Sequence, residues 1–233
     1  MTDRFYKAVK IAAQQDGYAV YLDSFALKTP AKNPIVLPSK ALAELVQAEW
    51  ESVDGKIDTM KMPMNRLVNT ALDRVPGNLD GLAQEFVAYA NHDLTCYRAE
   101  HPERLVELQE EIWGKWLKWC GMRFDVSFTV ARGIEPVDQP DDTLERLKHV
   151  YLQDKDNVLR MGGLSHATAL LGSAVLALAV EQKELSAEAA FMAAFLDEQF
   201  QIDQWGEDGE AAQRLQNRRN EIDEIVKYFG VLG

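Results

Sequence analysis

The chain has 233 residues, of which 47% are hydrophobic and 27% are charged, and its formal net charge at pH 7 is −12. This composition is that of a globular protein and excludes disorder along most of the chain. An acidic surface repels phosphate backbones and anionic lipid headgroups, which argues against nucleic-acid and membrane-surface binding. The charge is uneven: residues 1–60 hold 7 basic and 8 acidic side chains, so most of the negative charge falls on the remainder.

The first sixty residues predict strands and turns, with Asp16-Gly17 as a strong hairpin signal. Prolines on both sides of a short apolar run favour an edge strand. Ser39 is expected to cap a helix, because a serine side chain accepts a hydrogen bond from a first-turn N–H group. The expected elements are strands over 8–12, 18–22, 25–28 and 34–38 and a helix from 40 to about 50.

After Met62-Pro63 the apolar residues recur at spacings of three and four, which predicts helices. The predicted helices cover 63–75, 79–90, 105–120, 143–152, 164–180, 187–205 and 211–229. The helix over 164–180 is apolar nearly all round, so we expect it to be the buried central helix. The charge-free stretch 162–180 is only just long enough to span a bilayer, and a buried core helix fits its Gly- and Ala-rich composition better.

These patterns predict an α+β protein with two domains. The first, over 1–60, is a small β-rich N-terminal domain with one helix, and the second, over 61–233, is a larger all-α domain of orthogonal helices. Cys96 and Cys120 are too few for a disulfide framework, which favours reduced thiols and a cytosolic protein. Residues 1–7 show neither an apolar signal run nor an Arg- and Ser-rich leader, so we expect a cytoplasmic protein without membrane insertion.

The sequence contains no motif for nucleotide, metal or nucleophile chemistry. There is no Walker A motif, and Gly162-Gly163 and Gly172 are expected to permit close helix packing. His92 and Cys96 lie four residues apart, but a metal site needs three or four converging ligands. No G-x-S-x-G motif occurs. We therefore expect no catalytic residue, metal, nucleotide or other cofactor, while carboxylates far apart in the chain could still form an acid–base pair.

The segment 196–210 is the most unusual, with six acidic residues and no basic one. Glu198 falls on the apolar stripe of its predicted helix, and Arg218 falls on the apolar stripe of the next. A charge there must find a partner or reach water. Two alternatives follow: Glu198 and Arg218 form a buried or half-buried pair, or their side chains extend to solvent.

The end of this segment combines an aromatic side chain with carboxylates. Trp205 is followed by Glu207, Asp208 and Glu210. The last two lie near the start of the final helix, where the helix dipole favours anions. The functional alternative is an acidic patch beside an aromatic side chain that binds a basic protein partner. Trp50 is a further candidate contact, although a tryptophan on an amphipathic stripe usually belongs to the core.

The chain resembles the assembly chaperones of the ATP synthase catalytic head, in particular the family that binds the alpha subunit. The motifs that carry the resemblance, in order, are Arg4-Phe5-Tyr6-Lys7, Leu22-Asp23, Leu27-Lys28-Thr29-Pro30, Leu37-Pro38, Glu49-Trp50, Met62-Pro63, Asp73, Asp93, Tyr97-Arg98-Ala99 and 196–207. Each motif alone is weak, but their order and spacing together are specific.

The resemblance implies a chaperone that shields the unassembled alpha subunit of the F-type ATP synthase until the beta subunit replaces it, without nucleotide. It also implies a bacterial cytoplasmic member of a family whose eukaryotic relatives are in the mitochondrial matrix. We expect Trp205, Glu207, Asp208, Glu210 and Trp50 to contact the client. Two alternatives are a carboxylate-based hydrolase or lyase with an interdomain cleft, and an adaptor for another basic protein.

Overall fold

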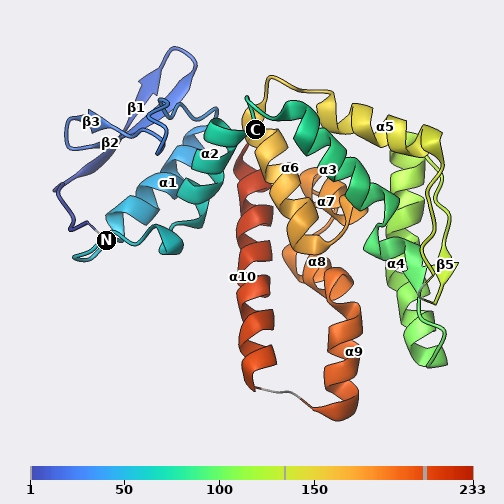
Figure 1. The fold of residues 1–233 in the computed structure, drawn as a ribbon. Coiled ribbons are helices and arrows are strands. Elements are labelled where there is room, and N and C mark those ends of the chain that lie inside the picture. Colours follow the sequence, from blue (N-terminus) through green and yellow to red (C-terminus); the bar gives the residue numbers. More distant parts are fainter. Residues whose placement is uncertain (1, 134, 207–208, 233) are drawn as a thin grey trace. The chain divides into compact units, whose positions relative to one another are not determined.

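The computed structural model describes residues 2–133, 135–206 and 209–232. It is a mixed α and β structure with a helical majority and a small sheet near the N-terminus (Figure 1). The chain forms two compact units, which are described separately here. The first unit comprises Met1–Leu79, Asp156–Gly163 and Lys227–Gly233, and the second comprises Asp80–Lys155 and Leu164–Val226.

The sheet of the first unit is antiparallel, in the order β1-β2-β3. Its strands are β1 (Val9–Gln14), β2 (Gly17–Leu22) and β3 (Phe25–Ala26). The predicted hairpin is confirmed. At its turn Gly17 has φ +148°, and a Cβ atom there would lie 2.2 Å from the carbonyl oxygen of Leu37, so the position requires glycine.

The edge strand predicted over 34–38 is wrong, because only isolated bridges form there. Tyr18 and Leu37 exchange two backbone hydrogen bonds, each 2.8 Å long. Pro34 and Pro38 have no N–H group to donate, which limits the pairing on both sides of this short run.

Two helices, α1 (Lys40–Glu51) and α2 (Pro63–Arg74), complete the N-terminal part of the first unit, and the short 3-10 helix η1 (Thr59–Lys61) lies between them. Ser39 caps α1 as predicted, accepting a hydrogen bond of 3.0 Å from the N–H of Leu42. The Glu49 carboxylate accepts hydrogen bonds of 2.7 and 2.8 Å from the N–H groups of Met64 and Asn65, at the start of α2. It therefore caps the positive end of that helix.

The two glycines of α6 (Val158–Leu171) lie against other helices of the first unit. A Cβ atom on Gly162 would lie 2.6 Å from the Cβ of Ala71, and one on Gly163 would lie 2.7 Å from the ring of Tyr228 in α10 (Gly209–Leu232). The Tyr228 hydroxyl donates to the carbonyl of Leu159 at 2.9 Å. The prediction of close helix packing is confirmed for Gly162 and Gly163 and is wrong for Gly172, where a Cβ atom would meet nothing within 4 Å.

The remaining elements lie mainly in the second unit: α3 (Leu79–Asn91), η2 (Leu94–Cys96), β4 (Tyr97–Arg98), α4 (Glu103–Phe124), β5 (Ala131–Arg132), α5 (Asp141–Leu152), α7 (Ala174–Glu181), α8 (Ala187–Ala194) and α9 (Leu196–Trp205). Because β4 and β5 pair in parallel, the region predicted to be all-α contains a small two-stranded sheet. The domain boundary near residue 60 stays a prediction; the compact unit that contains the N-terminus extends to Leu79 and so includes α2.

Two helices predicted as continuous are each divided in the structure. The predicted central helix over 164–180 breaks at Gly172, which has φ +63°, so that α6 ends and α7 begins with Ser173 as its cap. The predicted helix over 187–205 breaks at Phe195, where φ is −118° and ψ is 26°. The end predicted for the helix over 105–120 is also wrong, because α4 continues to Phe124 and ends at Asp125, which has φ +57°.

Every residue of α7 from Ala174 to Val180 is buried, which confirms a buried central segment, although it is shorter than predicted. None of the helices formed by 2–133, 135–206 and 209–232 is both long and apolar enough to cross a membrane. The charge-free stretch is therefore divided between two core helices of the protein.

A buried carboxylate fixes the start of α7. Asp93 accepts hydrogen bonds from the N–H and hydroxyl of Thr95 (3.0 and 2.7 Å), from the hydroxyl of Ser173 (2.7 Å) and from the N–H of Val175 (3.0 Å). Burial raises the pKa of Asp93, and these hydrogen bonds oppose that rise. The side chain therefore joins η2 to the first turn of the buried helix.

Asp93→Asn should lower the free energy of unfolding by about 3 kcal/mol, because an amide N–H₂ would face hydrogen-bond donors in a buried site. Urea denaturation followed by circular dichroism measures this change. Glu85→Gln, at an exposed position on α3, is the matched control and should change stability by less than about 0.5 kcal/mol. Equal effects of the two substitutions would contradict the role given to Asp93.

The thiols of Cys96 and Cys120 should not react with Ellman's reagent in the native protein. Both side chains are 0% exposed, and burial raises the pKa of each thiol, so little reactive thiolate forms. Both should react in concentrated urea, at a midpoint that coincides with loss of helical circular dichroism. Rapid modification without urea would show that this part of the core opens readily.

Candidate functional site

The most exposed aromatic side chain lies at the end of α9, whose first turn is firmly held. The indole N–H of Trp113 donates to the carbonyl of Ala193 at 2.7 Å. The Gln109 amide donates to the carboxylate of Asp197 at 2.8 Å and accepts from the N–H of Ala99 at 2.7 Å. Trp113 and Gln109 are buried on α4, so α4 positions the junction between α8 and α9.

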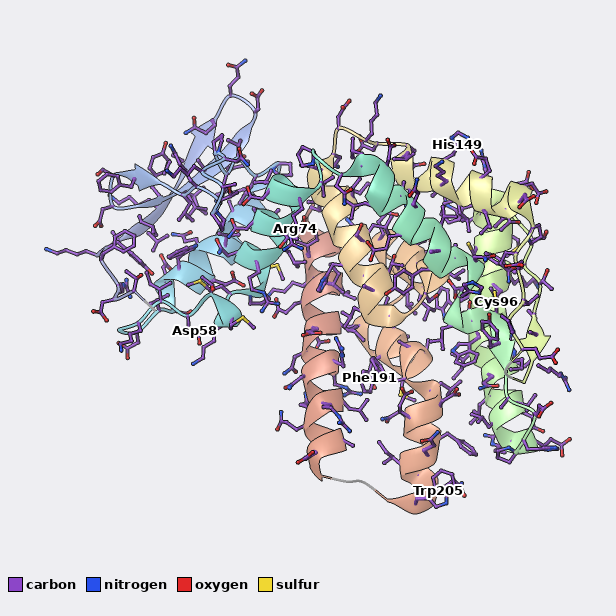
Figure 2. All side chains as sticks on the ribbon, viewed as in Figure 1. Asp58, Arg74, Cys96, His149, Phe191 and Trp205 are labelled. Carbon is purple, nitrogen blue, oxygen red and sulfur yellow. The ribbon has the colours of Figure 1, made fainter. Side chains whose placement is uncertain are left out.

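Beyond that junction, α9 is largely uncovered. Within the described residues its one buried side chain is Leu196. Ile202 is half-buried, and Trp205 is 80% exposed. Gly206, with φ +87°, ends the helix, and Figure 2 shows Trp205 at this end.

The facing helix α10 has a covered part and an open part within the second unit. The Arg219 guanidinium forms an ion pair of 3.1 Å with Glu188 and lies 4.6 Å from the centre of the Phe191 ring, so it ties α10 to α8. Beyond it Ile222 and Ile225 are completely buried. Residues 209–218, by contrast, include no buried side chain.

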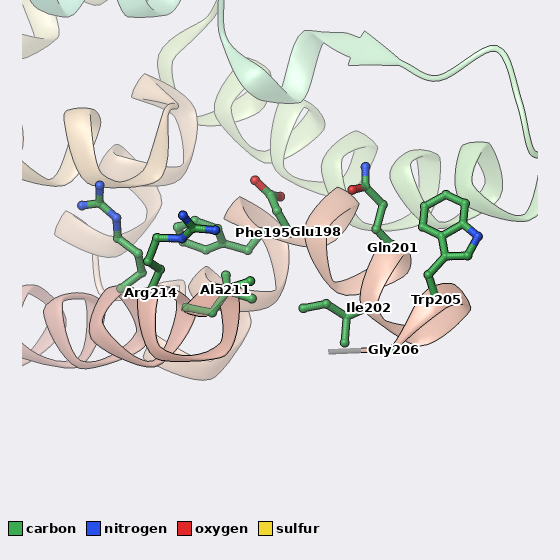
Figure 3. A pocket seen from close by; sticks show the side chains of 10 residues that line it. Phe195, Glu198, Gln201, Ile202, Trp205, Gly206, Ala211 and Arg214 are labelled. Atoms are coloured by element: carbon green, nitrogen blue, oxygen red, sulfur yellow. The ribbon is translucent and has the colours of Figure 1, made fainter. Parts of the chain in front are cut away.

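The open parts of the two helices enclose a cavity of about 480 Å³, which we call the α9–α10 groove. Figure 3 shows Ile202 on α9 and Ala211 on α10 pointing into the space between the helices. Its lining residues are Phe195, Glu198, Gln201, Ile202, Trp205, Gly206, Ala211, Arg214, Leu215 and Arg218. The groove therefore has an apolar floor with polar and charged side chains around it.

The structure brings Glu198 and Arg218 to the same groove, but it does not bury them. Both side chains are exposed, and Arg218 forms an ion pair of 3.0 Å with Glu221 on its own helix. The hypothesis of a buried pair is wrong because the two helices leave the space between them open to solvent. Both side chains instead extend to solvent, as the alternative prediction stated.

The other predicted contact residues differ in their surroundings. Trp205 lines the groove, while Glu210 is exposed in the first turn of α10. Glu207 and Asp208 lie outside the described residues.

Trp50 has internal partners in the first unit. It is half-buried, its indole N–H donates to the side-chain oxygen of Asn65 at 3.1 Å, and its carbonyl accepts from the Tyr6 hydroxyl at 2.5 Å. These contacts give Trp50 a structural role, and client contact at this residue stays a prediction.

Sequence reasoning missed two groups of exposed side chains. Arg214 lines the groove four residues before Arg218, a spacing that places both on one helix face. A second cavity, of about 780 Å³, has among its lining residues Glu103, Glu107 and Glu111 of α4. These glutamates also lie four residues apart in the sequence, a spacing that predicts a continuous acidic face on one helix.

Negative charge is concentrated in the second unit. This unit holds 27 acidic and 13 basic residues, whereas the first unit holds 10 and 12. The groove thus belongs to a unit whose field attracts positively charged surfaces.

Among the described residues, the groove is lined by one carboxylate, that of Glu198, and by no histidine or cysteine. Within the described ranges, no three His, Cys, Asp or Glu side chains converge as metal ligands would. Asp93, whose pKa is raised by burial, is 0% exposed and has its hydrogen-bond partners inside the core. The geometry of the groove is that of a binding surface, with apolar side chains at its centre and charges at its rim.

Comparison with known proteins relates the chain to a chaperone family. Residues 3–121 match the family model described as ATP12 chaperone protein. The crystal structure of Atp12 from Paracoccus denitrificans is similar over 99% of this chain and 98% of its own, with 31% sequence identity and a TM-score of 0.91. The structure of Atu1473 from Agrobacterium tumefaciens is similar over 99% of this chain and 86% of its own, with 35% identity and a TM-score of 0.91.

Trp205→Phe should remove most of the tryptophan emission that acrylamide quenches, because Trp205 is 80% exposed. Stability should change by less than about 0.5 kcal/mol, as at other exposed positions. Trp116→Phe is the control: Trp116 is 6% exposed, so its loss should leave the quenchable emission in place. Unchanged quenching in Trp205→Phe would mean that this side chain is covered in solution.

Proposed function

Because the chain belongs to the ATP12 chaperone family, whose members are ATP synthase assembly chaperones, we propose that it binds the unassembled alpha subunit of the F-type ATP synthase. It holds this subunit without nucleotide, prevents its aggregation and releases it when the catalytic head assembles. An unassembled subunit exposes the apolar surface meant for its neighbours, and such surfaces aggregate.

The observation that carries this proposal is Trp205, exposed beside an apolar groove on the acidic unit. Exposed tryptophans next to apolar pockets are typical centres of protein interfaces. The surrounding carboxylates favour a client with basic residues around its apolar surface, since charges at a rim select partners and speed association. Glu207, Asp208 and Glu210 are proposed members of this rim.

The motifs that carry the family resemblance support the same location. Several of their carboxylates have partners inside the chain: Asp23 accepts from the N–H groups of Lys7 and Ala8, and Asp73 accepts from the N–H of Ala31. These residues maintain the fold. The described part of this last motif, 196–206, instead runs from the held junction of α9 to the exposed Trp205, which suits binding.

Release follows from competition. If the beta subunit binds the same face of the alpha subunit more tightly, mass action displaces the chaperone without ATP hydrolysis. The absence of a Walker A motif from the sequence agrees with this scheme. Two free, buried cysteines and relatives from two bacterial species support a bacterial cytoplasmic location.

A second candidate function is an adaptor for a different basic protein. The cavity at the start of α4 favours it, because five of its eight lining residues are glutamates, which can bind basic side chains. An alpha-subunit chaperone should bind through the groove, whereas an adaptor of this kind should bind through Glu103, Glu107 and Glu111. Their substitution therefore separates the two functions.

Trp205→Ala should weaken capture of co-expressed alpha subunit by about 2 kcal/mol or more, which is roughly 30-fold. The reason is loss of a large contact at the centre of the interface. Co-purification and titration with the isolated complex measure the change. Met122→Ala, at an apolar position that is 73% exposed on α4, is the matched control and should leave capture unchanged.

Charge reversal of Glu207 should also weaken capture while the circular dichroism spectrum stays the same. Failure of the unaltered chain to capture alpha subunit at moderate salt would refute the proposed function. Loss of capture only after charge reversal of Glu103, Glu107 and Glu111 would favour the adaptor.

A further inference from the structure

The α9–α10 groove is a place where the chain leaves its own apolar side chains without a covering layer. Ile202, Ala211 and Leu215 are half-buried, whereas Ile222 and Ile225, farther along the same stripe of α10, are 0% exposed. The apolar stripe of α10 therefore continues beyond the core into the groove. The open part of this stripe is apolar like a core surface, but no other element of the described chain packs against it.

The lining of the groove suits a polypeptide better than a small molecule. Sites for small molecules place a few well-held polar groups to orient the ligand. The charged and amide side chains here, Glu198, Gln201, Arg214 and Arg218, are all exposed, so none is fixed by burial. They form a solvated rim around an apolar floor, as at the edge of a protein interface.

The walls of the groove favour a helix as the occupant. Both walls are α-helices, whose backbone N–H and C=O groups bond within each helix, so an extended peptide has no sheet edge to join. A third helix can instead place its side chains in the channel between two others.

The charges on the two walls differ in sign. The groove-lining charge on α9 is Glu198, and those on α10 are Arg214 and Arg218. A complementary helix therefore carries basic residues along one flank of its apolar stripe and acidic residues along the other.

We propose that the α9–α10 groove holds one amphipathic helix of the client, with an apolar stripe between a basic and an acidic flank. The stripe lies on Ile202 and Leu215, the basic flank lies along Glu198, and the acidic flank lies along Arg214 and Arg218. Trp205 packs against the apolar end of the stripe. This inference rests on the proposed function, since it names the part of the alpha subunit that the site takes.

Three fluorescently labelled, stapled helical peptides test the proposal. They share one apolar stripe and differ only in their flanks: one basic and one acidic, both basic, or both acidic. At physiological ionic strength, where long-range attraction to the acidic chain is screened, the mixed peptide should bind the full chain about 10-fold more tightly than either other peptide. Fluorescence anisotropy gives the three affinities.

Charge reversal provides the decisive variants, because a damaged fold cannot create a new preference. Arg214→Glu combined with Arg218→Glu should make the fully basic peptide the tightest ligand. Glu198→Lys should make the fully acidic peptide the tightest. Ile202→Glu should abolish binding of all three. The inference would be overturned if the three peptides bound with equal affinity or if the fully basic peptide bound best to the unaltered chain. It would also be overturned if the charge-reversal variants preferred the same peptide as the unaltered chain.

Capture of the alpha subunit by the same variants keeps this inference separate from the proposed function. If the unaltered chain captures the subunit and Ile202→Glu captures it equally well, the groove is not the site, although the chaperone function stands. If the unaltered chain captures none, the chaperone function itself fails. Sedimentation equilibrium tests whether a second copy of the chain fills the groove instead. A dimer that Ile202→Glu dissociates would show that it does.

Discussion

The attachment of α9 through its first turn determines which surface the second unit leaves open. Leu196 is its one buried side chain among the described residues, and Asp197 is held by the buried amide of Gln109. These contacts fix the first turn of the helix, while Ile202 and Trp205 beyond that turn line a cavity. An apolar surface that the fold leaves open costs stability, so its presence at the end of a well-packed unit suggests a use outside the chain.

Other contacts in the second unit hold the helices next to that attachment. Asp93 joins η2 to the first turn of α7, and every residue from Ala174 to Val180 is buried. Arg219 then ties α10 to α8 through Glu188 and the Phe191 ring. A well-packed unit with one open apolar surface suits a chaperone, because such surfaces are typical of protein-binding sites.

Much of the fold was predictable because local signals determine it. Asp16-Gly17 and Ser39 acted as expected, and apolar spacing located most of the helices. The break at Gly172 has a local signal, a glycine followed by the capping Ser173, which the apolar pattern of 164–180 outweighed in the prediction. The break at Phe195 has no such signal, because no glycine, proline or capping residue marks it. The candidate site was predicted only in part. Trp205 was singled out from the sequence. Whether Glu198 and Arg218 are buried depends on the distance between two helices, and the periodicity of the sequence does not give that distance.

Hydrogen–deuterium exchange on the isolated chain and on its complex with the alpha subunit is the most direct test of the central claim. The claim is that the client covers the open end of α9 and the facing turns of α10. The account predicts slower exchange over 199–206 and 209–218 in the complex, with exchange over α7 unchanged because that helix is already buried. Protection confined to the sheet of the first unit or to α4, with 199–218 unaffected, would contradict it.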